Sequence, residues 1–178
     1  MVIEFRELTK EEESIFKESL DYWLIDPTLI ENFKFIIGEG NWKEVFVATD
    51  EVMESLSKHS QITPYSTGLG IGEIKEGKFI LSLSGGSFIS KYTNKKAVVN
   101  EEAEQLFLYK RNILGKSIHK IHESIEEKDK ILVLSENNDY LGIGQLLVDK
   151  SLLTKLEFSE KNVLKNIIDL GWYLRKGK

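Results

Sequence analysis

Residues 103–121 have the sequence AEQLFLYKRNILGKSIHKI, and the character of this stretch changes in the middle. Its first part, Ala103 to Tyr109, has the apolar content of a helix that packs on a core. Its second part contains only basic ionisable side chains, namely Lys110, Arg111, Lys116, His119 and Lys120. Such a run is unexpected in a chain of net charge −5. From charge alone, ordinary solvated lysines and a phosphate-binding surface remain equally good explanations.

The segments around this stretch predict short strands and one helix. Asn100 is a good N-cap, and Glu101 and Glu102 would lie in the first turn, where the helix dipole favours acidic groups. The helix should end between residues 109 and 112. Strands are predicted at 96–99, 118–122, 131–135, 140–148 and 166–174, with a turn at 137–139. Several short strands around one helix favour a small barrel-like sheet.

The first half of the chain predicts a mixed α/β domain. LTKEEE at 8–13 is a capping box, and the helix after it would place Ile15, Leu20, Trp23 and Leu24 on one face. Strands are predicted on both sides of a turn in FKFIIGEGNWKEVFVAT (33–49), and again in STGLGIGEI (66–74) and KFILSLS (78–84). A change of pattern near KYTNKK (91–96) indicates two domains, 1–94 and 95–178.

Composition narrows the class of protein. The chain has 178 residues, 41% of them hydrophobic, and no cysteine, so neither disulfides nor a thiol nucleophile are expected. No segment has the run of about 20 apolar residues that a membrane span needs, and the acidic N-terminus does not suit a signal peptide. Residues 1–91 carry 9 Lys and Arg against 16 Asp and Glu, whereas residues 92–178 carry 15 against 13. We therefore expect an intracellular protein with an acidic first half.

Candidate catalytic and metal-binding groups are few. His119 and His122 are three residues apart in a predicted strand, so their rings should point to opposite faces, and His59 stands alone. GLGIGE (68–73) lacks the spacing of a dinucleotide-binding loop, so its glycines are expected to allow close strand packing. The sequence predicts no catalytic residue, no metal site and no cofactor.

Two sets of segments carry a family resemblance. AEQLFLYKRNILGKSI (103–118), DYLGIGQ (139–145) and NIIDLGWYLR (166–175) resemble, in order and spacing, a PUA domain, which is a small RNA-binding pseudobarrel. LTKEEE and GLGIGEIKEGKFILSLSGGSFISKY (68–92) resemble the pre-PUA half of ribosome-biogenesis factors of the Nip-seven type, as does the direct run of this half into KKAVVNEEAEQLFLY (95–109). The resemblance covers nearly the whole chain. It implies an α+β protein, with an N-terminal mixed α/β pre-PUA domain and a C-terminal PUA-like β pseudobarrel.

The resemblance also implies a function. Such a protein would be a non-catalytic RNA-binding factor in large ribosomal subunit biogenesis and rRNA processing. It would hold single-stranded RNA or rRNA across the helix at 101–112, the strand at 115–122 and a last strand at 169–176. The matching RNA-binding residues are Lys110, Arg111, Lys116, Lys120, Lys150, Lys155, Arg175 and Lys176. PUA domains commonly have glycine where this chain has Lys110.

Partners and compartment follow from the same resemblance. The acidic N-terminal half would bind ribosome-assembly or exosome-type proteins, and neither a membrane partner nor oligomerisation is expected. The compartment would be the cytoplasm, or the nucleolus in a eukaryote. Two alternatives remain: a protein-interaction adaptor with little RNA binding of its own, and an RNA-modifying enzyme whose first half is catalytic.

Overall fold

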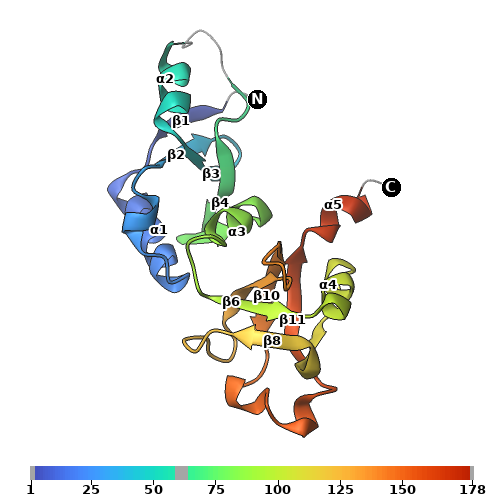
Figure 1. Ribbon diagram of the computed structural model, residues 1–178. Coiled ribbons are helices and arrows are strands. Elements are labelled where there is room, and N and C mark those ends of the chain that lie inside the picture. The colour runs from blue at the N-terminus through green and yellow to red at the C-terminus, as the bar shows by residue number, and fades with distance from the viewer. Residues whose placement is uncertain (1–2, 59–63, 177–178) are drawn as a thin grey trace. The chain divides into compact units, whose positions relative to one another are not determined.

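A computed structural model describes residues 3–58 and 64–176, which form two compact units divided between Tyr92 and Thr93 (Figure 1). Each unit has its own sheet and its own helices. In the described residues, no helix is both long enough and apolar enough to cross a membrane.

The first unit is built on a five-stranded antiparallel sheet. Its strands lie side by side in the order β1-β2-β3-β4-β5. They are β1 (Glu4–Glu7), β2 (Lys34–Glu39), β3 (Lys43–Ala48), β4 (Leu69–Lys75) and β5 (Lys78–Leu81). The helices of this unit are α1 (Lys10–Tyr22), a 3-10 turn η1 (Pro27–Ile30), α2 (Asp50–Lys58) and α3 (Leu83–Ile89). The strands predicted in 33–49 and 66–74 are therefore confirmed. The strand predicted over 78–84 ends at Leu81, because Ser82 caps α3, and β1 was not predicted.

Helix α1 begins where the capping box predicted. The Glu12 N–H donates to the Thr9 hydroxyl, and the Thr9 N–H donates to the Glu12 carboxylate. Phe16 of α1 packs on rings from two strands of the sheet, at 4.7 Å from Phe35 and 5.3 Å from Phe79, measured between centroids. The prediction for Leu24 was wrong: the helix ends at Tyr22, and Leu24 has φ +54° with 43% of its surface exposed.

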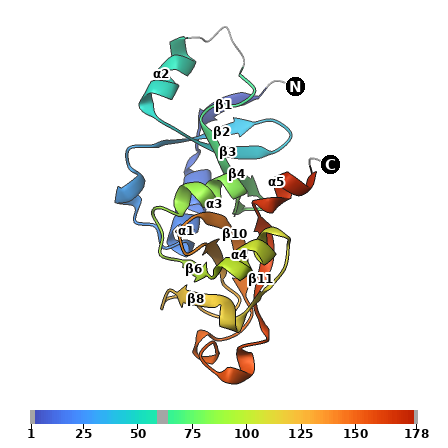
Figure 2. The same cartoon turned by 45° about the vertical axis from the view of Figure 1, so that its right-hand side comes forward.

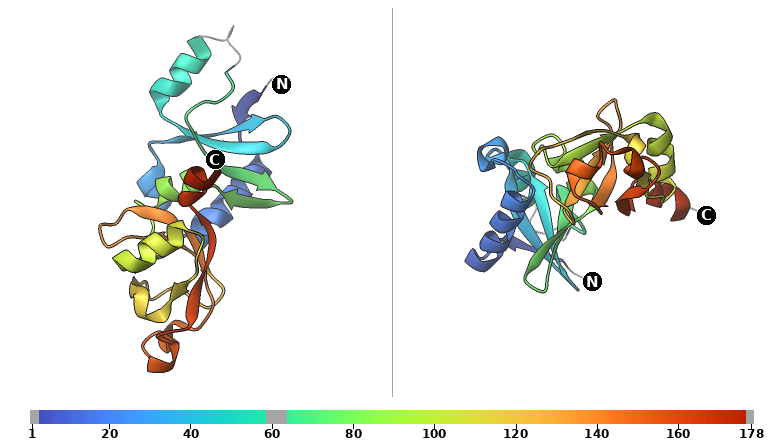
Figure 3. Two further views of the ribbon diagram at one scale, coloured as in Figure 1. Left: turned by 90° about the vertical axis from the view of Figure 1, so that its right-hand side faces the viewer. Right: turned by 90° about the horizontal axis from the view of Figure 1, so that it is seen from below.

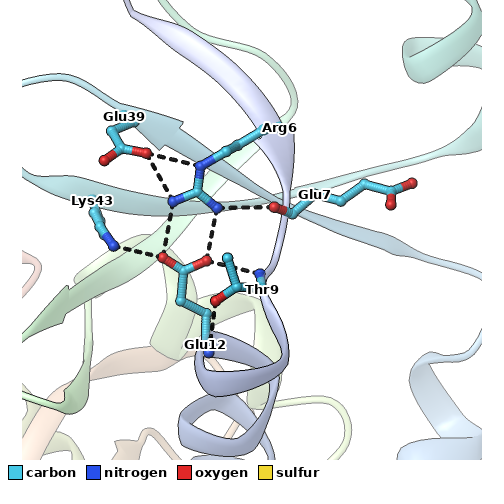
Figure 4. Close-up of polar contacts among 6 residues, drawn as sticks. All are labelled: Arg6, Glu7, Thr9, Glu12, Glu39 and Lys43. Carbon is cyan, nitrogen blue, oxygen red and sulfur yellow. Dashed lines mark hydrogen bonds and ion pairs between the residues drawn. The ribbon is translucent and has the colours of Figure 1, made fainter.

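A buried carboxylate fixes the entry of the chain into α1 (Figure 4). The Glu12 side chain is 5% exposed and pairs with Arg6 at 2.7 Å and with Lys43 at 2.8 Å. Arg6 also pairs with Glu39 at 2.8 Å, so its guanidinium lies between two carboxylates. The hydrogen bond from Arg6 holds the pKa of Glu12 well below its usual range. The network thus joins β1, β2, β3 and α1.

The second unit is built on a curled six-stranded sheet. The strand order is β7-β11-β10-β9-β6-β8, and only the pair β6–β9 is parallel. These strands are β6 (Lys96–Val99), β7 (Ile113–Leu114), β8 (Ile118–Ile121), β9 (Lys130–Leu134), β10 (Tyr140–Leu146) and β11 (Asn162–Asp169). The two outermost strands, β7 and β8, are joined by only the three residues of η2 (Gly115–Ser117), so the sheet must curl into an open barrel. The predicted pseudobarrel is confirmed.

Helix α4 (Glu101–Leu108) covers this barrel, and two further 3-10 turns, η3 (Lys150–Leu152) and η4 (Leu156–Phe158), lie between β10 and β11. The Asn100 side chain caps α4 by accepting from the Ala103 N–H at 2.9 Å, as predicted. Phe107, on the inner face of α4, is fully buried with Ile113, Val133 and Leu164.

The end of the chain differs from the prediction. The last strand was expected over 166–174 and placed by the resemblance at 169–176. Strand β11 instead stops at Asp169, and Gly171–Lys176 form a helix, α5. Helix α5 starts directly at the end of α4, where a Cβ added to Gly171 would collide with the Leu108 carbonyl oxygen. Figures 2 and 3 show α5 beside α4.

Candidate nucleic-acid interface

The carboxyl end of α4 is a Schellman motif. This turn contains Lys110 and Arg111, the first two predicted RNA-binding residues. The Lys110 N–H donates to the Phe107 carbonyl at 2.9 Å, and the Arg111 N–H donates to the Leu106 carbonyl at 3.0 Å. This geometry turns the chain sharply and requires a left-handed residue, which is Lys110 at φ +64°. Both Lys110 and Arg111 are exposed at this turn.

The left-handed backbone conformation at this position explains why PUA domains commonly have glycine here. Glycine adopts positive φ without strain, whereas a residue with a Cβ is destabilised there by about 1–2 kcal/mol. Lys110 occupies the same conformation and adds a cation to it. In the part of the chain that the structure describes, neither Lys110 nor Arg111 forms an ion pair with an acidic side chain.

Arg175 lies close to these cations but has other partners. Its Nη1 donates to Asp169 Oδ1 at 2.9 Å and to the Leu108 carbonyl, and its Nη2 donates to Asp169 Oδ2 at 3.1 Å. The side chain of Asp169 is only 1% exposed, and its buried negative charge is compensated by the guanidinium of Arg175. Arg175 thus holds α5 against the end of α4 and neutralises the negative end of that helix.

Asn166 is a second tie that sequence reasoning missed. Its side-chain Nδ2 donates to the Phe107 carbonyl at 2.7 Å, and its backbone N–H donates to the Asn112 Oδ1 at 3.0 Å. Strand β11 is therefore anchored to both sides of the α4 turn. No local sequence pattern identifies this contact, because Asn166 and Phe107 are 59 residues apart.

The remaining predicted cations lie on other elements. Lys116, in η2, pairs with Glu160 at 2.9 Å, and this contact raises its pKa. Lys120 is exposed on β8, opposite Val98 of β6. Lys150 begins η3 and Lys155 precedes η4. Lys176 ends α5, and its side chain lies outside the described part of the structure. Of the seven predicted residues whose side chains the structure describes, it thus brings Lys110, Arg111 and Arg175 together.

Exposed aromatic rings accompany the two free cations. Tyr109 is 74% exposed, Tyr173 54% and Trp172 39%. Trp172 and Tyr173 form an edge-to-face pair with centroids 5.1 Å apart and an interplanar angle of 88°. We call Tyr109, Lys110, Arg111, Trp172 and Tyr173 the α4–α5 surface. It offers two cations and three rings at the adjoining ends of α4 and α5.

The other groups considered in the sequence have structural partners. His119 contacts Glu136 at 2.7 Å and His122 contacts the Ser124 hydroxyl at 2.7 Å, so the two rings are held separately; His59 lies outside the described residues. Within the described ranges, no cluster of three or more His, Cys, Asp or Glu side chains could hold a metal ion. In GLGIGE, a Cβ at Gly72 would collide with the Ile80 carbonyl oxygen of β5, which confirms the close-packing prediction.

Comparison with known proteins gives two matching family models. The UPF0113 PUA domain matches residues 95–178, and the NIP7/UPF0113 pre-PUA domain matches residues 5–83. A UPF0113 protein of Archaeoglobus fulgidus is 28% identical over 98% of this chain and 96% of its own length. A UPF0113 protein of Aeropyrum pernix is 33% identical over 78% of this chain and 72% of its own length.

A eukaryotic relative and a solved structure extend this comparison. The 60S ribosome subunit biogenesis protein NIP7 homolog of Dictyostelium discoideum is 28% identical over 70% of this chain and 72% of its own length. A conserved PUA domain protein of Thermoplasma acidophilum, 15% identical, has the same fold with a TM-score of 0.62 over 98% of this chain and 99% of its own. The chain belongs to the NIP7/UPF0113 family, with a pre-PUA domain followed by a PUA domain.

Proposed function

We propose that this protein is a non-catalytic RNA-binding factor of large ribosomal subunit biogenesis and rRNA processing, and that it holds RNA through its PUA domain. The observation that carries the proposal is the exposed, uncompensated pair Lys110 and Arg111 at the Schellman turn of α4. The name of the Dictyostelium relative supports the ribosomal role. Residues 1–94 and 95–178 would be the two functional domains of a monomer that works wherever ribosomes are assembled, in the cytoplasm of an archaeon or the nucleolus of a eukaryote.

The contacts divide the predicted residues by role. Lys110 and Arg111 would neutralise phosphates directly, because the fold does not use their charges. Lys120, Lys150, Lys155 and Lys176 would extend the path of the RNA backbone. Lys116 would contribute less to RNA binding, because the carboxylate of Glu160 already offsets its positive charge. Arg175 would act by positioning α5, because its guanidinium already binds Asp169 and Leu108.

The experiment is a titration of the purified protein with single-stranded RNA of about 12 nucleotides, at several salt concentrations between about 50 and 200 mM. The test variant is Lys110→Glu/Arg111→Glu. The matched control is Lys17→Glu/Lys78→Glu, which changes the net charge equally at two exposed lysines of the first unit. We expect the test variant to lose at least tenfold in affinity and the control to stay within about twofold. Equal behaviour of the two variants would remove Lys110 and Arg111 from the interface.

An acidic segment of the first unit favours a second role, as an adaptor for a protein partner. Residues 18–33 contain four acidic and no basic residues, and they also carry the exposed apolar side chains of Tyr22, Leu24 and Leu29. Acidic groups around apolar anchors suit a basic segment of a ribosome-assembly or exosome-type protein. An adaptor of this kind would keep its partner after ribonuclease treatment and would lose it in Leu24→Asp/Leu29→Asp. Complete loss of the partner on ribonuclease treatment alone would contradict this role.

A further inference from the structure

We propose that the Glu160 carboxylate competes with RNA phosphates for Lys116, and that this competition directs RNA to the cations of the α4 turn. The inference rests on the proposed function and adds an acidic residue that limits where the ligand binds. Glu160 would act as a specificity-determining residue of the PUA domain, since it weakens one part of the basic surface and leaves Lys110 and Arg111 unaffected.

The contact between Glu160 and Lys116 resembles the contact that a phosphate would make. Glu160 lies in the segment between β10 and β11, which Figures 1 and 2 show in orange below β8. Lys116 Nζ donates to both oxygens of the Glu160 carboxylate, at 2.9 and 3.1 Å. A phosphate would likewise present oxygens of one negatively charged group to this ammonium. A phosphate that binds Lys116 in the same way must therefore displace Glu160.

The fold does not depend on this ion pair, because the backbone already joins the same two segments. The Lys116 N–H donates to the Ser159 carbonyl at 3.0 Å. The Gly115 N–H donates to the Lys161 carbonyl at 3.1 Å. The side chains of Lys116 and Glu160 are 43% and 71% exposed, and exposed ion pairs contribute little to stability. Glu160 can thus leave Lys116 while the backbone contacts between the segments remain.

A second acidic side chain acts on Lys116 from a greater distance. The hydrogen bond from Glu160 raises the pKa of Lys116 most, and the negative charge of Glu102, in the first turn of α4, raises it further. The Asn100 N–H donates to the Ser117 carbonyl at 3.0 Å, which joins this end of α4 to η2. At the opposite end of the helix, Lys110 has no ion pair with an acidic side chain among the residues that the structure describes. The positive charge is therefore offset at η2 and available at the α4 turn.

This difference in charge selects a binding position. A short RNA strand that binds at η2 has to replace an existing contact of Lys116, whereas a strand that binds at the α4 turn replaces none. Proteins commonly obtain specificity by weakening the wrong contact as well as by strengthening the right one. We therefore expect the phosphates to engage Lys110 and Arg111 first, and Lys116 only when Glu160 has moved away.

The test compares Glu160→Gln with Glu157→Gln in titrations with single-stranded RNA of about 12 nucleotides. Both variants remove one negative charge from the same segment, and Glu157 is exposed and forms no ion pair in the described residues. Glu160→Gln should bind about two- to fivefold more tightly than Glu157→Gln, with a salt slope steeper by up to about 0.7. Equal affinities of the two variants would overturn the inference. If the parent protein binds no RNA, the proposed function fails, and this inference fails with it.

A double-mutant cycle tests whether the gain in affinity depends on Lys116. In a Lys116→Gln background, Glu160→Gln should bind RNA no more tightly than Glu157→Gln, because the cation that Glu160 offsets is absent. A gain of the original size in this background would contradict the inference. Thermal unfolding gives a readout without RNA: the Tm of Glu160→Gln should stay within about 4 °C of the parent, as expected for an exposed pair. A larger fall would show that the pair is structural and would overturn the proposal.

Discussion

Replacing Lys110 by glycine should make the PUA domain more stable and its RNA binding weaker. Lys110 has φ +64° in the Schellman turn of α4, where a Cβ crowds the following carbonyl. Its side chain is exposed and makes no ion pair in the described residues, so the fold loses nothing else when the side chain is removed.

The change in the free energy of unfolding of Lys110→Gly follows from two opposing contributions. Relief of left-handed strain is worth about 1–2 kcal/mol, and the greater flexibility of glycine in the unfolded chain costs about 0.5–1 kcal/mol. The net gain in the free energy of unfolding is therefore about 0.5–1 kcal/mol. For a unit of this size, that gain raises Tm by roughly 2–8 °C.

The matched control is Lys110→Ala, which removes the same charge and keeps the Cβ. Thermal unfolding followed by circular dichroism should show a higher Tm for Lys110→Gly than for Lys110→Ala, whose Tm should stay near that of the parent. Both variants should lose RNA affinity alike, and the slope of log affinity against log salt should fall by about 0.7 for one lost phosphate contact. If the two variants unfold at the same temperature, the strain argument is refuted; if neither loses affinity, Lys110 does not contact phosphate.

Three further changes test other parts of the structure. Glu12→Gln should lower the free energy of unfolding by about 1–3 kcal/mol at pH 7, in denaturant titrations, because Arg6 and Lys43 lose their shared carboxylate but remain partly solvated. Since the pKa of Glu12 is lowered in the folded state, its contribution is complete above pH 4.5 and declines as the pH falls further, so the difference between parent and variant should shrink in acid. Arg175→Lys keeps the charge but cannot span both Asp169 oxygens and the Leu108 carbonyl, so Tm should fall by several degrees while the salt slope of RNA binding stays constant. Gly72→Ala should destabilise the first unit by about 1–3 kcal/mol in the same denaturant assay, because its methyl group would meet the Ile80 carbonyl.

Local signals predicted those parts of the fold that depend on near neighbours. The caps of α1 and α4 involve residues three apart, and both were correctly located from the sequence. Most strands of both sheets were recognised because their apolar residues are bounded by turn residues, whereas the short strands β1 and β7 were not predicted. Helix α5 was missed because GWYLRK contains residues that favour strands, and because its helical form depends on contacts with Asp169 and Leu108.

The candidate site was predicted only in part for a similar reason. Exposure of Lys110 and Arg111 follows from their place just after an amphipathic helix, and the sequence indicates it. The role of Arg175 depends on the Leu108 carbonyl 67 residues away, which no local pattern shows. One signal was nevertheless available: Asp169 follows two isoleucines at the end of β11, where a buried carboxylate needs a cation, and Arg175 lies six residues later.

The position of Arg175 explains why the fold does not hold the side chains of Lys110 and Arg111. The carboxyl end of a helix attracts cations, so Lys110 and Arg111 could have been held there by the helix itself. Arg175 already donates to the Leu108 carbonyl, and Asn166 donates to the Phe107 carbonyl, so these C-terminal carbonyls have side-chain partners from β11 and α5. With Asp169 also neutralised by Arg175, the fold does not require the charges of Lys110 and Arg111. Under the proposed function, these two exposed cations are therefore available to the phosphates of RNA.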